Sequence, residues 1–72
     1  MDKNIVDSVI EQAGSVENLA SKVGVTRQAV YLWRSMGYIP MQRAKKIVEH
    51  YPQITLDELA SAYEDVVNAA SS

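Results

Sequence analysis

Cysteine is absent from this 72-residue chain, and histidine occurs only once. Without cysteine, disulfide bridges and cysteine-ligated zinc or iron–sulfur sites are excluded. A single histidine, His50, leaves no imidazole pair for a metal ion, and we expect neither a metal nor a cofactor. No apolar run approaches the about 20 residues of a membrane span, and Met1–Asn4 lack the pattern of a signal peptide. We therefore expect a cytoplasmic protein.

Acidic residues are absent from the middle of the chain. Residues 18–48 contain six of the seven basic residues and no Asp or Glu, so this segment carries a charge of +6. Residues 1–17 carry −3 and residues 49–72 carry −5, which leaves a net charge of −2. A basic centre between acidic ends gives the molecule one side suited to phosphate groups, although clustered charges also occur on ordinary solvated helix faces.

The apolar residues recur at helical spacing, and no segment shows a convincing strand pattern. We expect a compact all-α fold, in one domain spanning residues 1–72, with five helices at about residues 3–13, 16–23, 27–35, 40–51 and 55–69. Ser15 and Thr26 are the expected N-caps, and Thr55 with Glu58 has the spacing of a capping box. The expected buried positions of the second to fourth helices are Leu19, Ala20, Val23, Val30, Trp33, Met41, Ala44, Ile47, Val48 and Tyr51.

The segment from about residue 15 to about residue 35 has the spacing of a helix-turn-helix. Ala20 is small enough for two helices to cross closely, and Gly24 allows the positive φ that a tight turn needs. Val25 follows in the turn, and Val30 and Trp33 point inward from the next helix. The inward phase of Trp33 favours a core position over stacking on single-stranded bases.

Residues 18–33, followed by Gly37-Tyr38-Ile39-Pro40 and Arg43-Ala44, closely resemble the Cro-like repressors of lambdoid phages and prophages and the related YdaS-type antitoxin group. The resemblance extends from about residue 14 to about residue 51 and does not include residues 52–72. It implies a lambda-repressor-like, all-helical domain that binds operator DNA in a bacterial cell, often as a dimer on a two-fold site. Some Cro proteins have a C-terminal β-hairpin, but the periodicity of residues 56–67 favours a helix here.

One face of the helix at residues 27–35 carries the candidate base-reading residues. A helical projection places Arg27, Gln28, Tyr31, Leu32 and Ser35 together and opposite Val30 and Trp33. The N-terminal end of a recognition helix reaches the base edges in the major groove. Arg27 can therefore bind guanine and Gln28 adenine, while Tyr31 and Leu32 can pack on thymine methyl groups. Tyr31 can alternatively donate a hydrogen bond to a phosphate.

Polar residues around this helix are candidates for phosphate contacts, which orient a protein on DNA without reading its sequence. The expected DNA-backbone set is Ser15, Asn18, Lys22, Thr26, Arg34, Ser35, Gln42, Arg43 and Lys46. Any one of these side chains could instead be simply solvated.

The last helix has more apolar residues than a small core obviously needs. These residues can cover the core, form a seam between two copies of the chain, or do both. We expect a homodimer, because two recognition helices one DNA turn apart bind a two-fold site more tightly than one. The expected dimer interface consists of Ile54, Leu56, Leu59, Tyr63, Val66 and Val67.

Three functions remain open at this point. The first is a sequence-specific regulator of transcription that occludes a promoter, and the second is an antitoxin that binds both DNA and a protein partner. The third is a helical interaction module without DNA binding, which the intact face from Arg27 to Tyr31 does not favour. We expect no enzymatic activity, because the sequence offers no nucleophile–base pair and no phosphate-binding glycine loop.

Overall fold

Five α-helices joined by short turns make up the computed structural model, which describes residues 4–71 and contains no strand in that range. The helices are α1 (Ile5–Ala13), α2 (Val16–Val23), α3 (Arg27–Met36), α4 (Met41–His50) and α5 (Leu56–Ser71). The predicted all-α, five-helix fold is confirmed, and the observed ends lie within two residues of the predicted ones. Residue 3, the predicted start of the first helix, lies outside the described residues. The radius of gyration is 11.4 Å, close to the about 11 Å expected of a compact chain of this length.

Polar side chains fix the first turn of four helices. The predicted caps Ser15 and Thr26 accept hydrogen bonds from backbone N–H groups three residues further on, at 3.1 and 3.2 Å. Thr55 Oγ1 likewise accepts from the backbone N–H of Glu58 at 3.1 Å, which is one of the two hydrogen bonds of the predicted capping box. The complete box lies elsewhere: the Asn4 side chain accepts from the Asp7 N–H at 3.1 Å, and the Asp7 carboxylate accepts from the Asn4 N–H at 3.2 Å.

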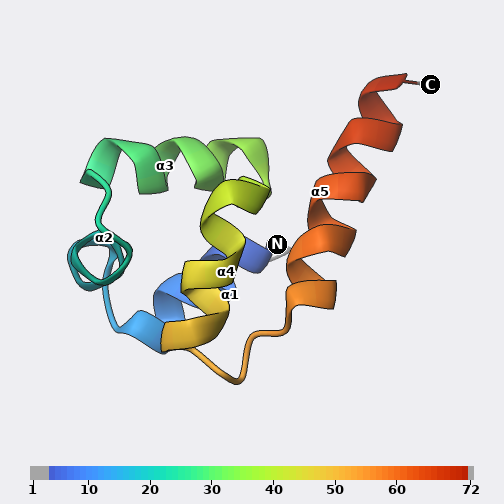
Figure 1. The fold of residues 1–72 in the computed structure, drawn as a ribbon. Coiled ribbons are helices and arrows are strands. Elements are labelled where there is room, and N and C mark those ends of the chain that lie inside the picture. Colours follow the sequence, from blue (N-terminus) through green and yellow to red (C-terminus); the bar gives the residue numbers. More distant parts are fainter. Residues whose placement is uncertain (1–3, 72) are drawn as a thin grey trace.

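The turn between α2 and α3 depends on Gly24. This residue has φ +74°, a left-handed conformation that glycine adopts without steric cost. The backbone N–H groups of Gly24 and Val25 both donate to the carbonyl oxygen of Ala20. These bonds end α2 and turn the chain sharply into α3, so that the two helices run in different directions (Figure 1).

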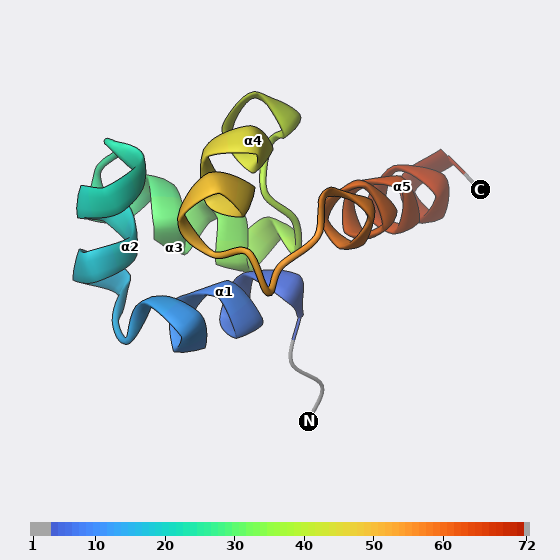
Figure 2. The same ribbon diagram turned by 60° about the horizontal axis from the view of Figure 1, so that its bottom comes forward.

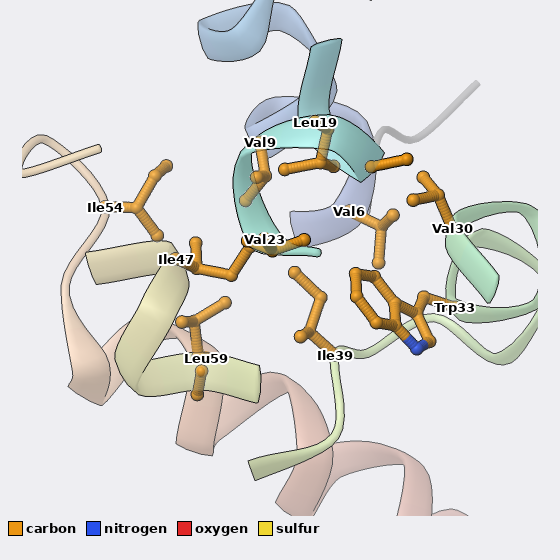
Figure 3. Close-up of a cluster of buried hydrophobic side chains, with 12 residues drawn as sticks. Val6, Val9, Leu19, Val23, Val30, Trp33, Ile39, Ile47, Ile54 and Leu59 are labelled. Atoms are coloured by element: carbon orange, nitrogen blue, oxygen red, sulfur yellow. The ribbon is translucent and has the colours of Figure 1, made fainter. Parts of the chain in front are cut away.

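A buried cluster from all five helices and two connecting segments holds these elements together (Figure 3). Trp33 is 4 % exposed and its indole lies beside Val6 and Ile39, which confirms its predicted place in the core. Met41 was predicted to be buried and is 41 % exposed, so that prediction is wrong. Met41 begins α4, and Ile39, in the connection between α3 and α4, lies in the core with no exposed surface.

The last helix, α5, lies on the opposite side of the molecule from α2, and its C-terminal half extends away from the other helices (Figures 1 and 2). Leu59 is fully buried, and Ile54, just before the helix, is 5 % exposed. Further along, the rings of Tyr38 and Tyr63 pack edge to face with centroids 5.1 Å apart. Within residues 4–71, none of the helices combines the length and apolar character needed to span a bilayer.

Candidate nucleic-acid interface

The two faces of α3 differ sharply in exposure. Val30 is fully buried, and with Trp33 it fixes the helix on the core. On the opposite face, Tyr31 is 53 % exposed and Leu32 is 58 % exposed. Arg27 and Gln28, in the first turn, are exposed on the same side as Tyr31. The structure therefore brings together the four residues predicted to read bases, on a helix held rigidly by its other face.

Arg27 has a partner on α2. Its Nη1 atom lies 3.1 Å from the Oε1 atom of Glu17, and the two side chains are 60 % and 72 % exposed. The pair joins the first turn of α2 to the first turn of α3 across the Gly24 turn. In the sequence, Glu17 stands out only as one of the acidic residues of the N-terminal segment, residues 1–17. No helical periodicity relates two residues that are ten positions apart and separated by a turn, so only the tertiary structure reveals this contact.

Three of the predicted phosphate-binding residues also stabilise local structure. Ser15 and Thr26 cap α2 and α3, and the Asn18 side-chain amide donates to the carbonyl oxygen of Ala13 at 3.1 Å. These contacts hold the side chains near the starts of α2 and α3. Each hydroxyl accepts a bond in its cap and so keeps its own proton for a second partner, and the amide keeps a second N–H.

Arg34 forms an internal ion pair that sequence reasoning did not foresee. Its Nε atom lies 2.8 Å from Asp7 Oδ1, and its backbone carbonyl accepts a hydrogen bond from the Asn4 side chain at 3.0 Å. These contacts tie the end of α3 to the start of α1. The prediction for Arg34 was a contact with phosphate alone. The structure shows that Arg34 also positions α3 against α1.

The other predicted phosphate-binding residues are exposed. Lys22 lies in the last turn of α2, Ser35 lies near the end of α3, and the remaining three lie on α4. Those three are Gln42, Arg43 and Lys46. Lys45, which was not assigned to this set, is exposed as well. Lys22, Arg43, Lys45 and Lys46 form no ion pair with another residue of the described chain.

The residues predicted to form the dimer interface differ in exposure. Ile54 and Leu59 lie in the core of the chain itself, where they are 5 % and 0 % exposed, and leave little surface for a second copy. Leu56, Tyr63 and Val67 are 49 %, 38 % and 39 % exposed and share one side of α5. Val66 is half-buried, and it lies beside the turn at Gly37, where an added Cβ would be 3.6 Å from Val66 Cγ2. The apolar surface that remains on α5 therefore consists mainly of Leu56, Tyr63 and Val67.

Other site chemistry is limited. Burial raises the pKa of the Tyr51 hydroxyl above its ordinary value, at the end of α4. Among residues 4–71, no three His, Cys, Asp or Glu side chains gather in an arrangement suited to a metal ion.

A scan of protein-family models, a search of curated proteins and a search of solved structures each found no match to this chain.

Proposed function

We propose that this chain is a sequence-specific regulator of transcription that binds double-stranded DNA through a helix-turn-helix formed by α2 and α3. The observation that carries the proposal is the exposed face of α3, on which Arg27 and Gln28 precede Tyr31 and Leu32. These side chains supply hydrogen-bond donors for purines and apolar surface for thymine methyl groups. The resemblance of residues 18–33 to Cro-like repressors supports the same assignment.

The charge distribution also supports DNA binding. Exposed cations lie on α2 and α4, the helices before and after α3 in the chain, whereas α5 carries only acidic charges. Phosphate contacts from Lys22, Arg43 and Lys46 would orient α3 in the major groove. The acidic helix α5 would then be repelled from the phosphate backbone and would remain on the outer side of the complex.

A dimer gives this domain its most effective mode of repression. Two copies that meet through the exposed side of α5 would present two copies of α3 to DNA. A two-fold operator requires these helices to lie about 34 Å apart, or about 17 Å from the two-fold axis. The molecule measures 35 × 24 × 22 Å, so such a separation is compatible with its dimensions. The bound dimer would cover a promoter and exclude RNA polymerase.

The test is the selection of bound duplexes from a random DNA pool at near-physiological salt. We expect an enriched two-fold symmetric site. Arg27→Ala should remove the preference at one base position in each half-site, by about 1–3 kcal/mol. Lys46→Ala should weaken binding to all sequences alike and lower the salt slope by about one unit per bound protomer. Absence of enrichment, or unchanged binding by both variants, would contradict the proposed interface.

A second candidate function follows from the apolar side of α5. Leu56, Tyr63 and Val67 lie exposed on a helix with four acidic residues, a surface that a protein partner could cover. A DNA-binding antitoxin would use α3 for its operator and α5 for its toxin. Measurement of the molar mass in solution distinguishes a dimerisation surface on α5 from a surface for a different protein. A dimer supports self-association, and a monomer that selects single half-sites favours another partner.

A further inference from the structure

The ion pair between Arg27 and Glu17 lies at the proposed DNA surface, and the fold does not depend on it for stability. Both side chains are more than half exposed, and such pairs contribute only about 0–1 kcal/mol to stability. The position of Arg27 is itself unfavourable, because a cation in the first turn of a helix opposes the helix dipole. Stability therefore does not explain why an arginine stands at this position beside a glutamate.

The geometry of the pair leaves most of the guanidinium free. The Glu17 carboxylate occupies Nη1, whereas a guanidinium presents five N–H donors in a planar fork. The remaining donors can still form the two parallel bonds to guanine O6 and N7. A carboxylate on one side of the fork restricts rotation of a long side chain, and this reduces the conformational entropy lost when the arginine meets a base.

The same carboxylate has the opposite effect on phosphate binding. Non-specific affinity for DNA comes from cations that replace counterions on the phosphate backbone. An arginine already paired with a carboxylate contributes little to this exchange, and the negative charge of Glu17 opposes close approach of a phosphate. The pair thus favours contact with a base edge over contact with the backbone.

We propose that Glu17 is a specificity-determining residue, which holds Arg27 in position to read a guanine and keeps it from binding phosphates indiscriminately. This inference rests on the proposed function and adds to it a residue outside the recognition helix. Glu17 acts through Arg27 and is therefore a positioning residue.

The test compares Glu17→Gln with a charge-matched control, Asp65→Asn. Asp65 is exposed on α5, on the opposite side of the molecule from α2 (Figures 1 and 2). Each variant removes one negative charge, so both change the net charge of the protein equally, but only Glu17 lies close enough to the proposed DNA surface to act on it directly. Two probes are used: the duplex enriched by selection, and the same duplex with the guanine opposite Arg27 replaced in each half-site.

The expected result is a change of opposite sign on the two probes. Glu17→Gln should lower affinity for the selected duplex by about two- to fivefold, and should raise affinity for the altered duplex by a similar factor. Its salt slope on the altered duplex should steepen by about one unit per bound protomer, because one more cation of each copy becomes available to phosphates. Asp65→Asn should shift both affinities in the same direction and by the same factor.

A double-mutant cycle shows whether the effect passes through Arg27. In an Arg27→Ala background, Glu17→Gln should no longer change the ratio of the two affinities. Equal shifts on both probes, or behaviour indistinguishable from that of Asp65→Asn, would overturn the inference while leaving sequence-specific binding intact. A wild-type protein that enriches no duplex would instead refute the proposed function itself. Thermal melts of each variant separate loss of folding from loss of discrimination.

Discussion

Replacement of Gly24 by alanine tests the backbone argument for the turn between α2 and α3. Gly24 has φ +74°, and no atom lies within 4 Å of the position that an alanine Cβ would take. The cost is therefore conformational, without a clash: a left-handed conformation costs an L-residue about 1–2 kcal/mol. The reduced freedom of the unfolded chain offsets about 0.4–1 kcal/mol of this. We expect Gly24→Ala to destabilise the fold by about 1 kcal/mol, and to lower Tm by about 4–8 °C.

Urea denaturation followed by far-UV circular dichroism and by Trp33 fluorescence measures this loss. Two further variants make the test specific to the backbone. Gly24→Asn should cost less than alanine, since asparagine tolerates the left-handed region, whereas Gly24→Val should cost more, because β-branched side chains avoid it. An alanine variant as stable as wild type, or an asparagine variant as unstable as valine, would refute the account of this turn.

Two other predictions concern α4 and α5. Because burial raises the pKa of Tyr51, the folded state holds that proton more tightly, and stability should fall as the pH rises above about 10. Tyr51→Phe should lose this part of the decline, which urea midpoints at several alkaline pH values would reveal as a difference from wild type. Leu59→Ala should cost about 2–5 kcal/mol of folding stability, since the side chain is fully buried. Leu56→Ala should cost far less in the monomer but weaken self-association in analytical ultracentrifugation, and equal losses of stability would contradict the division of α5 into buried and exposed sides.

The helices of this fold could be predicted because each carries local signals at its ends. Ser15 and Thr26 are short polar residues at the starts of apolar periodic segments, and Gly24 follows the end of one. Such signals act within one turn of helix and leave their pattern in the sequence. The two faces of α3 could be separated for the same reason, since a period of 3.6 residues distinguishes Val30 and Trp33 from Tyr31 and Leu32.

The errors arise where distant segments meet. The periodicity places Met41 on the buried side of α4, but Met41 is exposed, and Ile39 in the connection before α4 lies in the core. Periodicity also grouped Leu59 with Leu56, although only Leu59 faces the other helices. An apolar residue near the edge of a helical stripe is buried or exposed according to which neighbour lies beside it. A pattern within one helix holds no information about that neighbour.

The cross-helix ion pairs have the same origin, and they change the meaning of the charge distribution. Residues 18–48 appear in the sequence as an unbroken basic segment of charge +6, yet two of its three arginines pair with carboxylates from residues 1–17. Folding therefore partly neutralises the segment and leaves the unpaired cations on α2 and α4, the helices before and after α3 in the chain. A domain with few free cations binds DNA weakly through its backbone, since non-specific affinity grows with the number of phosphates neutralised. Under the function proposed above, tight binding to DNA would then depend on contacts of α3 to base edges and on a second copy of that helix, which is the balance that a sequence-specific regulator requires.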